Sequence, residues 1–209
     1  RRSYNRLITA YEALEDSINA NKWIKESKIN LTDEEMCELY TNTAMFIGNP
    51  NPFNKNVKNK SDYHKRKSVQ YLQDALTVCD EEEIHPKTGN RFDIDALVVI
   101  YSLRAYGVEH AKLSYEELIK SPKYNLKDKV DITYKIAMYM QENDWLQPYG
   151  DIDRDIALII DYYEKSLSYA KELDDIKEIV RTISGIIKAY GMINKLEYAM
   201  EYFYKEIRD

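Results

Sequence analysis

The sequence predicts an all-α protein, and three observations lead to that class. Apolar residues recur at spacings of three and four along nearly all of its 209 residues, which is the periodicity of one helix face. Its 6 glycines and 5 prolines are too few for a sandwich or barrel of many short strands and turns. No segment has the alternating apolar pattern of a half-buried strand. We therefore expect helices joined by short turns and a few longer loops.

Nine helices are expected from this periodicity, and local signals set several of their boundaries. Thr32 stands three residues before Glu35, a capping-box spacing that predicts a helix start directly after it. Gly107 suits a left-handed helix C-cap between two helices, and Pro122 ends the second of them. In chain order the expected ranges are Tyr4–Glu26, Asp33–Phe46, Lys65–Cys79, Asp93–Tyr106, Val108–Lys120, Val130–Gln141, Ile156–Ala170, Ile176–Tyr190 and Leu196–Ile207.

Three segments interrupt the helical pattern and are expected to be loops. Gly48–Ser61 holds two prolines and five asparagines and has no apolar face. Asp80–Arg91 is the second segment, and Leu146–Asp153, around Pro148-Tyr149-Gly150, is the third. A shorter break at Gly191–Asn194 joins the last two helices, which predicts an antiparallel hairpin.

Composition and cysteine content limit the class of protein. Hydrophobic residues make up 44% and charged residues 32% of the chain, which is typical of a globular protein. The longest apolar run, Ala96 to Tyr101, is much shorter than the about 20 residues that span a membrane. The opening Arg1-Arg2 follows no signal peptide, which suggests a trimmed or excised piece. Cys37 and Cys79 form neither a CxxC motif nor a disulfide framework, which predicts a reducing, cytoplasmic location.

An internal repeat indicates how the helices pack. Ala-Tyr-Gly occurs at 105–107 and again at 189–191. After each copy, a small residue precedes an aromatic residue by four positions, as Ala111/Tyr115 and as Ala199/Phe203. A small residue lets two helix backbones approach, and the aromatic side chain fills the space one turn along.

With these residues the chain resembles a tetratricopeptide repeat (TPR) array. The stretch 186–203 (IIKAYGMINKLEYAMEYF) follows the family's order of helix, turn and helix, with Asn194 at the usual glycine position of the turn. The resemblance is best over 129–209 and weaker over 93–121. It implies a right-handed α-solenoid of about four stacked antiparallel helix pairs. All of 1–209 would form one domain, of which 1–92 is the degenerate part and carries the loops 48–61 and 80–91.

Motifs for catalysis and cofactors are absent from the sequence. It has no P-loop, no GxGxxG and no GxSxG. The three histidines, His64, His85 and His110, fall in different elements, whereas a zinc site needs ligands that converge at short spacing. We expect no metal and no cofactor.

One pair of residues resembles an enzyme motif. Arg104 and His110 resemble the Arg-x4-6-His element of HEPN-type ribonucleases, which are also all-helical. That resemblance implies acid–base catalysis on a 2′-hydroxyl. Ala105 departs from the polar residue usual in the family, and Gly107 interrupts the motif. A lone Arg and His at this spacing arise easily by chance, so a surface or turn role is the favoured interpretation.

A basic stretch suggests a second possible partner. Lys55–Lys67 holds six Lys or Arg against one Asp, with Tyr63 among them, and could bind nucleic acid through charge and stacking. A solvated loop running into a helix start is the favoured interpretation, since the chain has a net charge of -6.

The predicted ligand site combines cations and tyrosines. Superposing the two Ala-Tyr-Gly copies makes Arg104 equivalent to Lys188, and Arg181 falls on the same helix face as Lys188. We call these three the basic strip; it could hold an acidic segment or a carboxylate, although solvated surface residues are the commoner alternative. Some of the 19 tyrosines should be partly exposed, among them Tyr101 and Tyr134, and exposed tyrosines are typical of binding surfaces.

The sequence leaves three function classes open. The leading one is a non-catalytic protein- or peptide-binding module that acts as a scaffold or regulatory domain of a larger assembly. The second is a peptide-sensing regulatory receptor of the bacterial signalling type, and the third is an HEPN-like ribonuclease that uses Arg104 and His110. No membrane partner is expected, and the predicted partner is a protein or peptide, with acidic character where it meets the basic strip.

Overall fold

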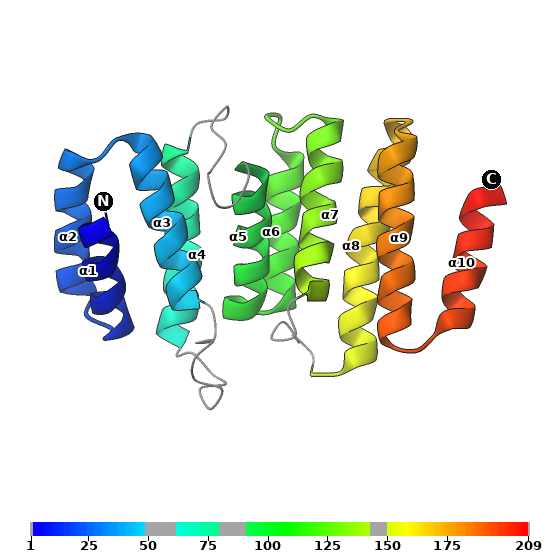
Figure 1. Ribbon diagram of the computed structural model, residues 1–209, viewed down its shortest axis with the longest axis horizontal. Coiled ribbons are helices and arrows are strands. Elements are labelled where there is room, and N and C mark those ends of the chain that lie inside the picture. Colours follow the sequence, from blue (N-terminus) through cyan, green and yellow to red (C-terminus); the bar gives the residue numbers. More distant parts are fainter. Residues whose placement is uncertain (1, 49–61, 80–90, 143–149, 209) are drawn as a thin grey trace. The chain divides into compact units, whose positions relative to one another are not determined.

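The computed structural model confirms the all-α class. It describes residues 2–48, 62–79, 91–142 and 150–208, and every regular element within them is an α-helix (Figure 1). The ten helices are α1 (Arg2–Ala13), α2 (Ser17–Asn30), α3 (Asp33–Gly48), α4 (Asp62–Val78), α5 (Arg91–Tyr106), α6 (Val108–Lys120), α7 (Leu126–Glu142), α8 (Ile152–Glu172), α9 (Ile176–Met192) and α10 (Leu196–Arg208). No helix among these residues is both long enough and apolar enough to cross a bilayer.

The helices form two compact units, Arg1–Ser114 and Tyr115–Asp209. In the first unit α1 packs against α2 and α3, and α4 packs between α3 and α5. In the second unit α8 packs against α7 and α9, α9 packs against α10, and α7 also contacts α9. Most of these contacts join helices that follow one another in sequence, and they bury apolar faces such as that of α8. The largest fully buried side chains are Tyr40, Tyr162, Tyr163, Ile8, Leu39, Ile47, Leu72, Ile94, Ile100, Ile132, Ile136 and Ile186.

The N-terminal segment departs from the prediction. A single helix over Tyr4–Glu26 is wrong, because the chain breaks after α1 and α2 begins at Ser17. Glu15 takes a positive φ of 59°, and the Asp16 side chain accepts a hydrogen bond from the Asn19 backbone N–H, which caps α2. Nothing in the apolar spacing marks this break, so the described residues contain ten helices and not nine.

Most other boundaries agree with the local signals. Thr32 and Glu35 exchange side-chain to backbone hydrogen bonds of 3.2 and 3.3 Å, which is the predicted capping box. Gly107 has φ +90° and Asn194 has φ 56°, so both take the left-handed conformation expected of them. The break expected at Gly191–Asn194 begins later, since α9 runs to Met192. Of the predicted loops, only their edges lie within the described residues.

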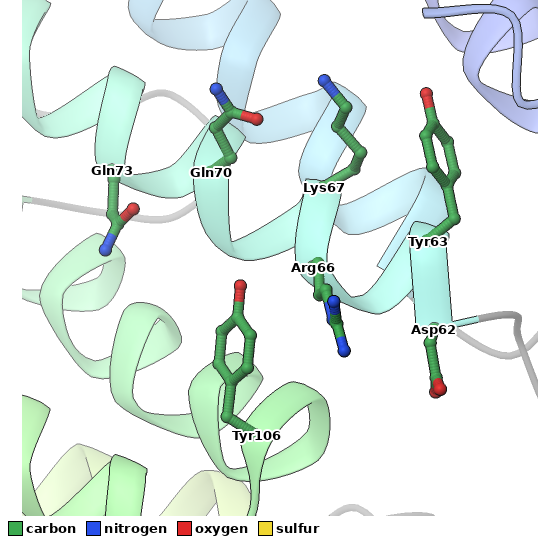
Figure 2. Close-up of a pocket in the computed structure, with 7 residues that line it drawn as sticks. All are labelled: Asp62, Tyr63, Arg66, Lys67, Gln70, Gln73 and Tyr106. Carbon is green, nitrogen blue, oxygen red and sulfur yellow. The ribbon is translucent and has the colours of Figure 1, made fainter.

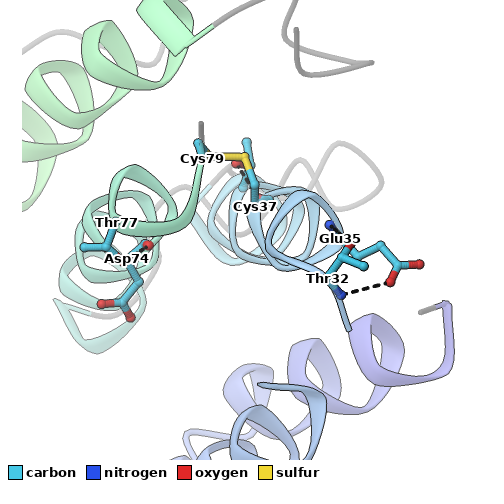
Figure 3. Close-up of a disulfide and its surroundings, with 7 residues drawn as sticks. Thr32, Glu35, Cys37, Asp74, Thr77 and Cys79 are labelled. Atoms are coloured by element: carbon cyan, nitrogen blue, oxygen red, sulfur yellow. Dashed lines mark hydrogen bonds between the residues drawn. A yellow bond between two sulfur atoms is a disulfide. The ribbon is translucent and has the colours of Figure 1, made fainter. Parts of the chain in front are cut away.

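A disulfide corrects the interpretation of the cysteines. The Sγ atoms of Cys37, in α3, and Cys79, directly after α4, lie 1.98 Å apart and their Cα atoms 5.2 Å apart (Figure 3). Both side chains are buried. The expectation of two unpaired cysteines is therefore wrong. Disulfides persist mainly in oxidising compartments, so this bond removes the ground on which the prediction of a cytoplasmic location rests.

Candidate functional site

The predicted site residues of the first unit have structural roles in the described structure. Tyr101 is only 3% exposed, so the expectation of a partly exposed ring is wrong. Its ring packs against Gly48 so closely that any side chain at position 48 would collide with it. Arg104 donates a hydrogen bond to the Gly48 carbonyl at the end of α3, and burial lowers the pKa of its guanidinium. Arg104 thereby satisfies a carbonyl at a helix C-terminus, where cations are favoured.

The two residues of the ribonuclease hypothesis have different surroundings. Arg104 is half-buried beside Gly48, whereas His110 is exposed in α6. The imidazole ring of His110 packs against the Tyr106 ring, with the centroids 4.6 Å apart. Acid–base catalysis with these two side chains stays a prediction.

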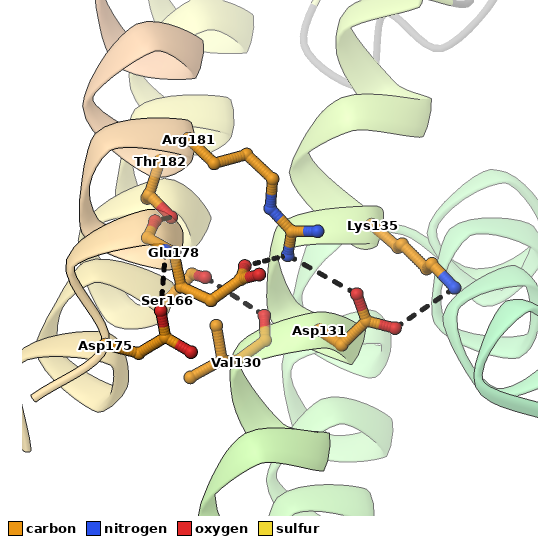
Figure 4. A network of polar contacts seen from close by, with 8 residues as sticks. All are labelled: Val130, Asp131, Lys135, Ser166, Asp175, Glu178, Arg181 and Thr182. Carbon is orange, nitrogen blue, oxygen red and sulfur yellow. Dashed lines mark hydrogen bonds and ion pairs between the residues drawn. The ribbon is translucent and has the colours of Figure 1, made fainter. Parts of the chain in front are cut away.

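In the second unit the structure brings Arg181 and Tyr134 together. The Arg181 Cζ lies 4.0 Å from the centroid of the Tyr134 ring, within the range of a cation–π contact. The same guanidinium pairs with Glu178 at 2.5 Å and with Asp131 at 3.3 Å (Figure 4). Lys135 pairs with the other oxygen of Asp131 at 3.1 Å. Two cations and two carboxylates thus join α7 to α9 in one polar network.

This network neutralises part of the charge of the basic strip, because Arg181 belongs to both. Each cation of the network already has a carboxylate partner, and Lys188 lies 4.0 Å from Glu142. Tyr134 is half-buried, as expected, and burial raises the pKa of its hydroxyl. An acidic ligand at this face would have to compete with Asp131 and Glu178. The strip therefore offers less positive charge than its sequence implies.

The first unit contains a polar cleft that the predicted site residues do not include. It has a volume of about 630 Å³ and lies along α4, with Tyr106 of α5 pointing toward that helix (Figure 2). Its lining residues are Asp62, Tyr63, Arg66, Lys67, Gln70, Gln73 and Tyr106. Tyr63, Arg66 and Lys67 belong to the basic stretch Lys55–Lys67, and the lining continues along α4 to Gln70 and Gln73. Positions 62, 66, 70 and 73 are spaced by three or four residues, so they share one face of a helix. This spacing could have indicated the polar face that lines the cleft.

The cleft has two cations, Arg66 and Lys67, and one carboxylate, Asp62, in its lining. Arg66 Cζ lies 6.0 Å from the centroid of the Tyr106 ring, and Lys67 Nζ lies 6.0 Å from that of Tyr63. Asp62 forms its ion pair with Lys65, at 3.4 Å. Within the described ranges neither Arg66 nor Lys67 forms an ion pair, and Arg66 and Gln70 are exposed. The cleft therefore presents two cations and one carboxylate beside two aromatic rings and two amides, with an excess of one positive charge.

A second, smaller hollow lies in the second unit and has the opposite charge. Its volume is about 310 Å³, and Asp153, Asp161 and Glu164 surround apolar residues of α8 and α9. Asp153 pairs with Lys195 at 3.3 Å, and Asp161 pairs with Lys165 at 2.7 Å. Across the described residues no group of three or more His, Cys, Asp or Glu side chains is placed to hold a metal ion.

Comparisons with known proteins add no assignment to this geometry. No protein-family model matches the sequence, and no curated protein matches it either.

Proposed function

We propose that this chain is a non-catalytic protein- or peptide-binding module of the helical-repeat type, acting as a scaffold or regulatory domain of a larger assembly. Stacking of helix pairs into a right-handed, TPR-like solenoid is part of the proposal. It is supported within each unit by contacts between alternate helices, α1 with α3 and α7 with α9. Repeat arrays of this kind present extended surfaces to polypeptide partners.

The cleft along α4 is the proposed binding surface, and its two cations are the observation that carries the proposal. A guanidinium forms paired, charge-assisted hydrogen bonds with a carboxylate, so Arg66 suits an Asp or Glu side chain of a partner. The amides of Gln70 and Gln73 can each donate to and accept from a peptide main chain. Tyr106 supplies an aromatic surface beside Arg66. The chemistry favours an acidic segment in an extended conformation.

Arg66, Gln70 and Gln73 follow one another along α4 and form a row. The length of this row suits a short stretch of an extended acidic segment. From position 66 to position 73 the helix rises about 10 Å, at about 1.5 Å per residue. An extended peptide rises about 3.3 Å per residue, so about three of its residues would lie along the row. One carboxylate near Arg66 and main-chain bonds to the two glutamines account for that length.

A thermal-shift screen tests the proposal. The chain is heated with acidic, neutral and basic peptide pools of matched length, because a ligand that binds only the folded state raises the unfolding temperature. We expect the acidic pool to raise it and Arg66→Glu to abolish the effect. Lys177→Glu is the matched control, since it makes the same change in net charge on an exposed part of α9. No shift with any pool, or the same shift in Arg66→Glu, would contradict the proposal.

The alternatives from the sequence have their own tests. If the basic strip is the binding surface, Arg181→Ala combined with Lys188→Glu weakens peptide binding while Arg66→Glu does not. A peptide-sensing receptor would respond to one peptide sequence and not to acidic pools in general.

Cleavage of labelled RNA that is lost in His110→Ala would favour the ribonuclease. RNA binding without cleavage would identify the α4 face as a nucleic-acid surface. The cytoplasmic location stays a prediction.

A further inference from the structure

A buried carboxylate lies beneath one wall of the cleft. Glu12, in α1, is 0% exposed, and each of its two carboxylate oxygens accepts a hydrogen bond from a tyrosine of α4. The Tyr63 hydroxyl donates to Oε2 at 2.5 Å, and the Tyr71 hydroxyl donates to Oε1 at 2.6 Å. Burying a carboxylate is costly unless donors satisfy it, so the two hydroxyls are what allow Glu12 to occupy this position.

Neighbouring contacts hold Tyr63 from a second side. The His64 Nε2 lies 3.0 Å from the backbone carbonyl oxygen of Glu12, to which it can only donate. Its Nδ1 lies 3.8 Å from the Glu15 carboxylate. The Tyr63 ring meets the His64 ring edge to face, with the centroids 5.6 Å apart and an interplanar angle of 84°. Glu12 therefore accepts the Tyr63 hydroxyl with its side chain and contacts the neighbouring His64 ring through its backbone carbonyl.

The two tyrosines that share Glu12 differ in one respect. Tyr63 lines the cleft, and Lys67 leaves α4 beside it on the same side (Figure 2). Tyr71 is 3% exposed and does not belong to the cleft lining. Burial and the hydrogen bond to Glu12 raise the pKa of the Tyr63 hydroxyl, which keeps the hydroxyl a donor through the neutral range. Because Tyr63 lines the cleft and Tyr71 does not, only the hydrogen bond from Tyr63 to Glu12 can influence a ligand in the cleft.

We propose that Glu12 is a positioning residue for the cleft: it fixes the Tyr63 ring and, through that ring, the place of the Lys67 ammonium group. The inference rests on the proposed function, because it concerns the affinity of the same surface. Its consequence is that α1, which supplies no residue to the lining, sets how well α4 and α5 bind an acidic segment.

The two tyrosines provide a matched pair of variants. Tyr63→Phe and Tyr71→Phe each remove one hydroxyl from the same carboxylate and leave the ring in place. Binding is measured by fluorescence anisotropy with a labelled oligoglutamate peptide as the probe, and folding is checked by circular dichroism. We expect Tyr63→Phe to weaken binding about fivefold, the size of effect that one hydrogen bond produces. Tyr71→Phe should stay within about twofold of the unmodified chain, even where it unfolds more easily.

A double variant separates positioning from a general loss of stability. Glu12→Gln should weaken binding as Tyr63→Phe does, and combining the two should add nothing, because both break the same interaction. If Glu12→Gln does not fold, the tyrosine pair alone decides. Equal affinities for the two tyrosine variants would overturn the inference while leaving the proposed function intact. No binding of the probe or of the acidic pools by the unmodified chain would overturn both.

Discussion

The backbone of Gly185, in α9, lies directly against the ring of Tyr163, in α8. A methyl group at position 185 would lie 2.6 Å from Cε1 of that ring, much closer than carbon atoms approach without repulsion. Tyr163 cannot easily yield, because it is buried and its hydroxyl donates to the Gln141 side chain at 2.8 Å. The absence of a side chain at 185 is thus what allows α8 and α9 to pack at this distance.

Gly185→Ala should therefore destabilise the second unit. Forcing one methyl group into a packed contact of this kind costs about 1–3 kcal/mol of the free energy of unfolding. Gly191→Ala is the matched control in the same helix, since a Cβ there meets nothing within 4 Å. The control should be neutral or stabilising by up to about 1 kcal/mol. Urea unfolding monitored by circular dichroism measures both, and equal effects would contradict the packing argument.

The disulfide predicts a large dependence of stability on reductant. Cys37 and Cys79 are separated by 42 residues, and closing a loop of that length stabilises the folded state by about 4 kcal/mol in the chain-entropy model. We expect added reductant to lower the unfolding midpoint of the unmodified chain strongly. Cys37→Ala combined with Cys79→Ala should unfold at a similarly low midpoint and should not respond to reductant. Two titratable thiols in the untreated protein, with a midpoint that reductant leaves unchanged, would exclude the bond.

We expect removal of the Glu164 charge to raise the free energy of unfolding slightly at neutral pH. Burial, with a smaller contribution from the Asp161 carboxylate, raises the pKa of Glu164 above its ordinary value of 4.5. A raised pKa means that the folded state binds the Glu164 proton more tightly than the unfolded state does. The stability that this proton contributes is therefore complete at low pH and is lost as pH rises through the folded pKa. Glu164→Gln should then be more stable than the unmodified chain at neutral pH, by a few tenths of a kcal/mol because the group is largely exposed.

The pH dependence of that difference is its own control. In acid, below the ordinary value of 4.5, Glu164 is protonated in the folded and the unfolded chain alike, and the gain should vanish. Thermal unfolding of both proteins at neutral and acidic pH measures it. A gain that persists unchanged in acid would show that charge is not its cause.

Helix periodicity could predict most of the fold because helices such as α3, α7, α8 and α9 bury an apolar face. The stripes of α9 and α10 give both helices from spacing alone, and Thr32, Gly107 and Asn194 mark boundaries through backbone chemistry that is local in sequence. The break at Glu15 carries no such mark, because neither glycine nor proline is present there. Single-residue conformations of this kind depend on packing that spacing does not encode.

The candidate site was less predictable because it depends on contacts between distant residues. Arg181 is basic in the sequence, but Asp131 lies 50 residues away and neutralises part of that charge in the fold. Tyr101 carries a polar group and is nevertheless buried against Gly48. The disulfide likewise joins Cys37, in α3, to Cys79, directly after α4, across 42 positions of the sequence.

Amide chemical-shift mapping tests the central claim most directly. The isotope-labelled chain is titrated with the oligoglutamate peptide, and the perturbed backbone amides are assigned. We expect the perturbations to concentrate between Tyr63 and Gln73 and at Tyr106, and to disappear in Arg66→Glu. Perturbations confined to α7 and α9, or none at saturating peptide, would contradict the account.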